Sequence, residues 1–217
     1  MKVFMILAMC FANFAFAELD PELAEVSSSN FNREGLFLGA QVSGWTAFDT
    51  ATSRGGAAFN YGGEVGYVMP RGSWDRLEIS AFVGRGVRQF TEKGGTKAKQ
   101  TMEDKFAGIV RVGIGYSLGT TAMAVWRIGA GLFSSDYTTE ISDTKYTSTS
   151  SYTGPVGQIG ADLVLQATPA LDFIVGLNVN QYQFDVDKVS SAQTDLEIDK
   201  PLNVNEIAAV LSMRYQL

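Results

Sequence analysis

Over most of the chain after residue 34, apolar residues alternate with polar or small ones at a period of two. In the first stretch, Leu36 and Leu38 share one face of an extended strand, and Phe37 and Gly39 share the other. This period is typical of β-strands whose two faces meet different surroundings. The pattern predicts an all-β fold of about eight strands, at roughly 36–48, 59–69, 77–86, 106–117, 124–132, 158–166, 171–180 and 206–217.

The connections between these strands alternate between short and long. The short ones contain residues that favour tight turns and lie near 70–75, 119–120 and 168–170. The long ones are rich in Ser, Thr, Gly and charge and cover about 49–56, 91–101, 134–151 and 185–200. This order predicts an up-and-down antiparallel barrel with short turns at one rim and long extracellular loops at the other.

Alternation alone also fits a soluble lipocalin-like barrel, whose apolar face points inward. Two features favour a transmembrane β-barrel with its polar face inside. The polar face is rich in glycine, as a narrow, strongly curved interior requires. The apolar face carries aromatic residues near the short turns, as in the interfacial girdle of a membrane barrel: Tyr67, Tyr116, Phe173 and Tyr215. An opposite aromatic belt is expected at Phe48, Phe59, Tyr61 and Phe106.

Four charged residues of the polar face lie at similar depths when counted from the short turns: Glu64, Arg111, Arg127 and Asp162. Two acids and two bases at one level form the compensated cluster that a low-dielectric interior requires. Such a cluster acts either as a static plug that stabilises the barrel or as a gate that switches partners and passes ions. We favour the plug.

The N-terminus has the pattern of a secretory signal peptide over residues 1–17. Lys2 precedes an apolar run, and Ala15-Phe16-Ala17 predicts cleavage after Ala17. A lipoprotein interpretation through Cys10 is disfavoured because the bulky Met9 stands where a small residue is expected. We expect residues 18–34 to form a periplasmic lead-in and residues 35–217 to form the barrel.

Composition excludes several classes of function. The chain is acidic, with a formal net charge of −6, which argues against a nucleic-acid partner. It has no histidine, so Ser-His hydrolysis and His-ligated metal chemistry are excluded. After the leader, no stretch approaches the roughly 18 apolar residues of a membrane helix. We expect no catalytic residue, no resident metal and no cofactor.

Two charged segments in the long loops are candidates for binding ions or lipids. Asp195, Glu197 and Asp199 would share one face of a strand and form a loop cation site. A second segment, with Arg88 nearby, would bridge lipid phosphates through Lys93, Lys97 and Lys99. In both cases we favour solvated charge over a binding site.

The chain resembles the eight-stranded outer-membrane barrels that include the OmpA transmembrane domain, OmpX and OmpW. The resemblance rests on Gly35-Leu36-Phe37-Leu38-Gly39-Ala40-Gln41, Tyr61-Gly62-Gly63-Glu64-Val65-Gly66-Tyr67, Gly157-Gln158-Ile159-Gly160-Ala161-Asp162 before the Thr168-Pro169 turn, and the closing Leu211-Ser212-Met213-Arg214-Tyr215-Gln216-Leu217.

The resemblance implies export to the outer membrane and assembly by the barrel-insertion machinery, which reads a C-terminal strand that usually ends in an aromatic residue. Leu217 stands at that position here. Glu64 resembles an inward glutamate of the family that takes part in a salt-bridge gate. The family's enzymatic relatives in the outer membrane rely on an essential histidine, which this chain lacks.

The leading hypothesis is a non-enzymatic outer-membrane barrel, surrounded by lipid and lipopolysaccharide, that acts in envelope integrity or recognises an unidentified surface ligand through its extracellular loops. The alternative is a narrow channel for small solutes or ions. A third possibility is a soluble periplasmic barrel that binds a ligand.

Overall fold

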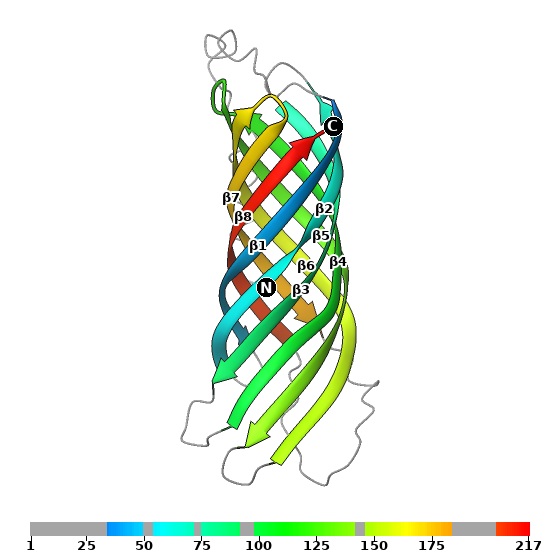
Figure 1. Ribbon diagram of the computed structural model, residues 1–217, viewed down its shortest axis with the longest axis vertical. Coiled ribbons are helices and arrows are strands. Elements are labelled where there is room, and N and C mark those ends of the chain that lie inside the picture. The colour runs from blue at the N-terminus through cyan, green and yellow to red at the C-terminus, as the bar shows by residue number, and fades with distance from the viewer. Residues whose placement is uncertain (1–33, 50–53, 72–74, 92–97, 142–145, 184–202) are drawn as a thin grey trace.

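The computed structural model describes residues 34–49, 54–71, 75–91, 98–141, 146–183 and 203–217. They form eight strands: β1 (Gly35–Asp49), β2 (Arg54–Pro70), β3 (Asp75–Thr91), β4 (Ala98–Ser117), β5 (Ala122–Ile141), β6 (Tyr146–Thr168), β7 (Leu171–Gln183) and β8 (Asn203–Gln216). Each strand pairs antiparallel with the next, and β8 pairs with β1, so the sheet closes into a barrel (Figure 1). The predicted all-β, up-and-down antiparallel barrel is confirmed. Within the described ranges, no helix has the length and apolarity of a membrane span.

The two faces of the barrel wall have opposite chemistry. Outward side chains are largely apolar and exposed; Ile128 is 62% exposed and Val110 is 60% exposed. Inward side chains include charged groups that are almost completely buried, such as Arg88 at 0% and Glu78 at 2%. This arrangement is the reverse of a lipocalin-like barrel, in which the apolar face points inward.

Glycines on the inner face leave room for aromatic rings that lie against the wall. Gly62 and Gly84 are cross-strand partners on β2 and β3. A Cβ atom at either residue would lie within 2.6 Å of the Phe82 ring. A Cβ atom at Gly66 would lie 2.4 Å from the Phe37 ring. The glycine-rich polar face therefore reflects a narrow interior whose remaining space is filled by rings.

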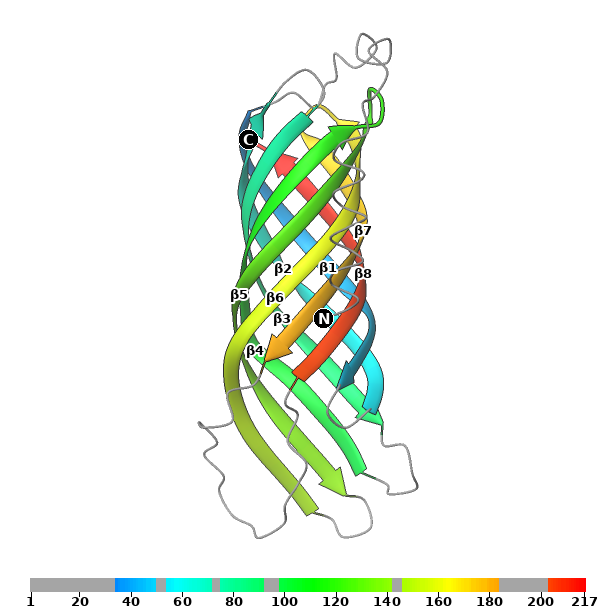
Figure 2. The same cartoon turned by 180° about the vertical axis from the view of Figure 1, so that it is seen from behind.

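Strands β4, β5 and β6 project beyond the rest of the wall at the end that carries the long connections. Figures 1 and 2 show them continuing past β1, β7 and β8. β5 and β6 pair continuously as far as Ile141 and Tyr146. The expected long loops over 91–101 and 134–151 are therefore wrong in extent, because β4 begins at Ala98 and most of 134–151 is paired strand.

The contrast between the two faces is lost in this projection, which is why the sequence pattern suggested a loop. Beyond Leu132, the outward positions of β5 become polar, beginning with Ser134 and Asp136. The inward positions alternate between aromatic and polar side chains, with Phe133 and Tyr137 2% and 6% exposed and Ser135 also buried. Polar outward side chains are expected where a strand passes from apolar surroundings into water.

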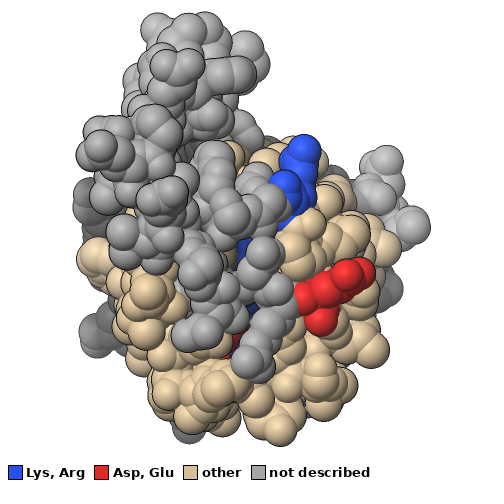
Figure 3. Space-filling view, turned by 90° about the horizontal axis from the view of Figure 1, so that it is seen from above, with Lys and Arg blue, Asp and Glu red and all other residues tan. Residues whose placement is uncertain are grey.

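The outward apolar side chains form a continuous band. On β5 the band runs from Ala122 to Leu132, about 33 Å along the strand at ~3.3 Å per residue. At a tilt of about 40°, this length corresponds to about 25 Å along the barrel axis, the usual height of a membrane barrel's apolar belt. Seen from the short-turn end, the described surface is mostly uncharged (Figure 3).

Aromatic side chains occur at both edges of this band. At the short-turn edge, Phe173 and Tyr215 are 46% and 53% exposed. Toward the long connections, the exposed aromatic residues include Phe48, Phe59, Tyr61 and Phe106.

A substitution that fills an inner-face glycine tests the packing of the interior. Gly66→Val places methyl groups against the Phe37 ring and the Ile79 carbonyl oxygen, which lies 2.7 Å from the Cβ position. We expect it to lower the free energy of unfolding in urea by about 1–3 kcal/mol, the usual cost of overpacking. Gly157→Val is the matched control, because nothing lies within 4 Å of its Cβ position. Equal stability of the two variants would contradict the crowded interior.

Candidate functional site in the barrel interior

Two groups of buried charged side chains occupy the barrel interior. The group nearer the short turns, here the turn-side network, consists of Glu64, Arg76, Glu78, Arg111, Arg127, Asp162 and Arg214. The group nearer the long connections, here the loop-side network, consists of Arg88, Asp104 and Glu206 with their partners Asn60, Ser135 and Asn180. Each charged member of both networks is at most 5% exposed.

Cross-strand glycines make room for the charged side chains. Gly39 on β1 lies between Glu64 on β2 and Arg214 on β8. Gly113 on β4 lies in the same way between Glu78 on β3 and Arg127 on β5. A glycine beside two long charged side chains allows them to extend across the lumen instead of competing for the same space.

The turn-side network is a chain of alternating bases and acids. Arg111 Nη1 lies 3.3 Å from Glu64 Oε1, and Arg214 Nη2 lies 3.6 Å from Glu64 Oε2. Arg214 also donates a 2.9 Å hydrogen bond from Nη1 to Glu78 Oε1. Glu64 therefore interacts with two bases at once, and Arg214 links it to a second acid.

The chain continues from Glu78 to the opposite wall. Arg127 Nη2 donates to Glu78 Oε2 at 3.2 Å, and Arg127 Nη1 lies 2.5 Å from Asp162 Oδ2. Arg76 also pairs with Glu78. Glu78 thus contacts three arginines and is the most highly connected acid of the network.

The structure brings the four residues predicted from the sequence into one network, but not as a direct quartet. Glu64 pairs with Arg111, and Arg127 pairs with Asp162. Arg214 and Glu78, which were not among the predicted residues, join the two pairs. Glu78 and Arg214 also lie on the polar face but closer to the short turns, and the long arginine side chains span that difference in depth.

The loop-side network is centred on Arg88. Its Nη1 donates to both carboxylate oxygens of Asp104 at 2.9 Å, and its Nε donates to Glu206 at 2.7 Å. Its Nη2 donates to Asn60 Oδ1 at 3.1 Å. For Arg88, both the favoured interpretation as a solvated loop charge and the alternative of a contact with lipid phosphates are wrong: β3 extends to Thr91 and directs this guanidinium into the lumen, where it is fully buried.

Three arginines stack on aromatic rings of the inner wall. The guanidinium carbons of Arg88, Arg111 and Arg214 lie 4.0, 4.5 and 3.9 Å from the ring centroids of Tyr182, Phe82 and Phe37, respectively. Cation–π contacts of this kind hold a buried guanidinium in place without an additional charge. Two of these rings, Phe37 and Phe82, are those that the glycines accommodate.

The two networks differ in how completely their polar atoms are paired. Among the described residues, the buried polar atoms that have neither a hydrogen bond nor an ion pair include Asp162 Oδ1, Arg111 Nε and Nη2, and Arg214 Nε, all in the turn-side network. No atom of the loop-side network is among them. Buried polar groups without partners are usually hydrated. The turn-side network is therefore the looser and more hydratable layer.

The described interior is nearly balanced in charge. Its buried charged residues are five arginines (Arg76, Arg88, Arg111, Arg127 and Arg214) and six acids (Glu64, Glu78, Asp104, Asp162, Asp172 and Glu206). Near-equality of opposite charges is the condition for burying so many of them in a low dielectric.

Two loop predictions remain outside these networks. Asp195, Glu197 and Asp199 lie outside the described residues, as do Lys93 and Lys97. Lys99 lies near the start of β4, where it is exposed and opposite Glu140 of β5. Among the described residues, no group of three or more acidic, His or Cys side chains is arranged to hold a metal ion.

No protein-family model and no curated protein matches the chain. Solved structures do match. Neisserial surface protein A (NspA) is 15% identical, with 84% of this chain and 97% of that chain covered and a TM-score of 0.47. The N-terminal β-barrel domain of Pseudomonas aeruginosa OprF is 16% identical, covers 85% and 100%, and has a TM-score of 0.40. The Escherichia coli outer membrane protease OmpT is 8% identical, covers 85% and 94%, and has a TM-score of 0.49.

These matches include outer-membrane and β-barrel proteins, the kind of protein that the sequence motifs resemble. At such identities the likeness concerns the fold alone, and function is inferred below from the chain's own residues.

Removal of one arginine from each network tests the difference between them. Arg88→Leu leaves Asp104 and Glu206 with only neutral hydrogen-bond donors, so we expect a loss of about 3–5 kcal/mol in the free energy of unfolding. Arg111→Leu leaves Glu64 with Arg214 and the Ser80 hydroxyl, so we expect a smaller loss. Urea titration of both variants in lipid vesicles measures the difference. An equal or larger loss for Arg111→Leu would contradict it.

Proposed function

We propose that this chain is a non-enzymatic barrel of the outer membrane of a Gram-negative bacterium, surrounded by lipid and lipopolysaccharide, that acts in surface recognition or envelope integrity. In this proposal residues 1–17 are a cleaved leader, and the barrel-insertion machinery assembles residues 35–217. The apolar band about 25 Å high supports the membrane location, because water disfavours a continuous exposed apolar surface of that size.

The observation that carries the proposal is the projection of β4, β5 and β6 beyond the apolar band. Its outward face is polar, and its strands remain paired as far as Ile141 and Tyr146. A paired sheet presents side chains in fixed positions, so it is a better recognition surface than a flexible loop. The residues at the tip of the β5–β6 hairpin are therefore candidates for contact with a surface ligand.

The buried charge networks favour a resting state in which the lumen is blocked. Two successive networks of buried charge cross the lumen, and the loop-side network has every buried polar atom paired among the described residues. The sequence also lacks histidine, the usual general base of outer-membrane hydrolases, which supports a role without catalysis.

Shortening of the β5–β6 hairpin tests this proposal. Residues 138–149 are replaced by a tight turn that joins Tyr137 to Ser150, which pair directly in the barrel. We expect the variant to remain folded, with heat-modifiable migration on a gel. We also expect expressing cells to lose adhesion to immobilised glycans and matrix proteins, or to become permeable to a small dye.

A second variant has the same residues replaced by Gly and Ser at constant length. It removes the surface side chains without shortening the chain, so it should show the same loss. A folded short variant with unchanged adhesion and unchanged permeability would contradict the role of the projection. Extraction of the wild type without detergent would contradict the membrane location itself.

A gated channel is the second candidate, and the turn-side network is the observation that favours it. Glu64 interacts with both Arg111 and Arg214, so it has an alternative partner if one contact breaks. The unpaired atoms of the network also provide sites for water. Exchange of partners in such a layer would open a narrow aqueous path.

Planar-bilayer recordings of the wild type and Glu64→Gln test this candidate. If Glu64 holds the gate, removal of its charge leaves Arg111 and Arg214 without their shared acid, and we expect a several-fold change in open probability. Glu103→Gln is the matched control, because Glu103 is exposed on the outer wall. Conductance that does not respond to either substitution would exclude Glu64 as a gate.

A further inference from the structure

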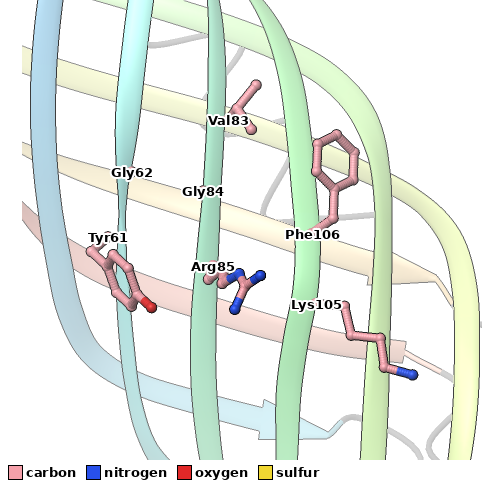
Figure 4. Close-up of a pocket in the computed structure, with 7 residues that line it drawn as sticks. All are labelled: Tyr61, Gly62, Val83, Gly84, Arg85, Lys105 and Phe106. Carbon is pink, nitrogen blue, oxygen red and sulfur yellow. The ribbon is translucent and has the colours of Figure 1, made fainter.

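A shallow groove lies on the outer wall of the barrel, at the edge of the apolar band nearest the long connections (Figure 4). Its volume is about 430 Å³. We call it the outer groove. It is lined by Tyr61, Gly62, Val83, Gly84, Arg85, Lys105 and Phe106. It therefore spans β2, β3 and β4 where the outward side chains change from apolar to charged.

A β-bulge in β4 builds one side of the groove. In the pairing of β4 with β5, Asp104 is opposite Ser135 and Phe106 is opposite Ser134, so Lys105 has no partner. The extra residue allows the consecutive side chains of Lys105 and Phe106 both to be exposed, whereas Asp104 is buried in the lumen. Bulges often redirect a side chain toward a functional position. Here the bulge places a cation beside an exposed aromatic ring.

An outward-facing glycine lies beside the groove. Gly62 and Gly84 line the groove with backbone only, because side chains at these positions would point inward at Phe82. The neighbouring outward residue, Gly63, has nothing closer than 3.7 Å to its Cβ position. The outer surface at this point is therefore lower than the surrounding rim of Tyr61, Val83 and Phe106.

The groove is polarised along the barrel axis. Val83 and Phe106 lie on the side of the apolar band, and Arg85 and Lys105 lie toward the projecting ends of the strands (Figure 4). Val83 and Phe106 are 53% and 45% exposed. An occupant must therefore be apolar at one end and anionic at the other.

Arg85 is the principal cation of the groove. It is exposed, and within the described part of the chain no hydrogen bond or ion pair engages it. Lys105 already forms an ion pair, because its Nζ lies 2.7 Å from Asp136 Oδ1. Partial burial raises the pKa of Asp136, but hydrogen bonds from Lys105 and Ser151 outweigh it and lower the pKa. Asp136 therefore stays ionised at neutral pH, and Glu103 is a further exposed acid on the Lys105 side.

We propose that the outer groove binds a phosphorylated lipid of the surrounding leaflet, with an acyl chain against Val83 and Phe106 and a phosphate on Arg85. Lys105 provides a second, weaker contact with the same headgroup. A guanidinium forms paired, charge-assisted hydrogen bonds with phosphate, which suits the exposed Arg85. This inference rests on the proposed membrane location and adds a defined lipid site to it.

The test measures retention of lipid A that carries two phosphates by the full chain in detergent, using native mass spectrometry. We expect Arg85→Gln to weaken retention at least tenfold, as the loss of a charge-assisted hydrogen bond predicts. Lys105→Gln should weaken it less. Arg71→Gln is the matched control, since Arg71 is exposed near the opposite end of the barrel. Wild-type protein should bind dephosphorylated lipid A as weakly as Arg85→Gln binds the phosphorylated form.

Retention by Arg85→Gln equal to that of the wild type would overturn the proposal, as would equal binding of lipid A with and without phosphates. Heat-modifiable migration on a gel is checked for every sample, because it shows whether the barrel is folded. It therefore distinguishes a failure of the lipid site from a failure of the proposed membrane barrel. A barrel that is intact and detergent-dependent but indifferent to Arg85 would refute the lipid site alone.

Discussion

The pairing of charges that solvent hardly reaches is the constraint on which the rest of this barrel depends. An isolated buried charge is costly, and removing one partner of a buried pair costs several kcal/mol. The interior meets this constraint by linking acids and bases across the lumen, so that Glu78 alone contacts Arg76, Arg127 and Arg214. Arg76 lies on the same strand as Glu78, whereas Arg127 and Arg214 come from β5 and β8, so two of these contacts connect strands far apart in the sequence.

Space for these charges comes from glycine, and their position is fixed by aromatic rings. Gly62 and Gly84 allow the Phe82 ring to lie against the wall, and Arg111 stacks on that ring while it contacts Glu64. The loop-side network uses Tyr182 under Arg88 in the same way. On the outer face a different glycine, Gly63, leaves the wall low beside the outer groove.

Much of the fold could be predicted from the sequence because period-two alternation directly reflects a wall with two different faces. The strand number, the short turns and the polar interior followed from it. The projection of β4, β5 and β6 could not be predicted in this way, since its outward positions become polar and the contrast between the two faces is lost. Arg88 was misplaced for the same reason: a strand assumed to end before Thr91 could not direct residue 88 into the lumen.

The candidate site was only partly predictable. The position of a residue along its strand gives its depth in the barrel, but it does not show how far a long side chain extends from that position. Glu64, Arg111, Arg127 and Asp162 lie at similar depths and do fall in one network. Arg214 lies nearer the short turns, but its side chain is long enough to join Glu64 and Glu78. The bulge at Lys105 was also hidden, since the sequence pattern contains no signal for an unpaired residue within a strand.

The central claim is that the apolar face of the wall contacts lipid around a closed, charge-paired interior. Spin labels at single cysteines test it most directly, and the only native cysteine, Cys10, lies in the predicted leader. Labels at Val110, Ile128 and Val175 should be accessible to oxygen and protected from a water-soluble nickel complex, whereas a label at Thr138 should show the reverse. Exposure of the first three labels to the nickel complex in reconstituted membranes would contradict the claim.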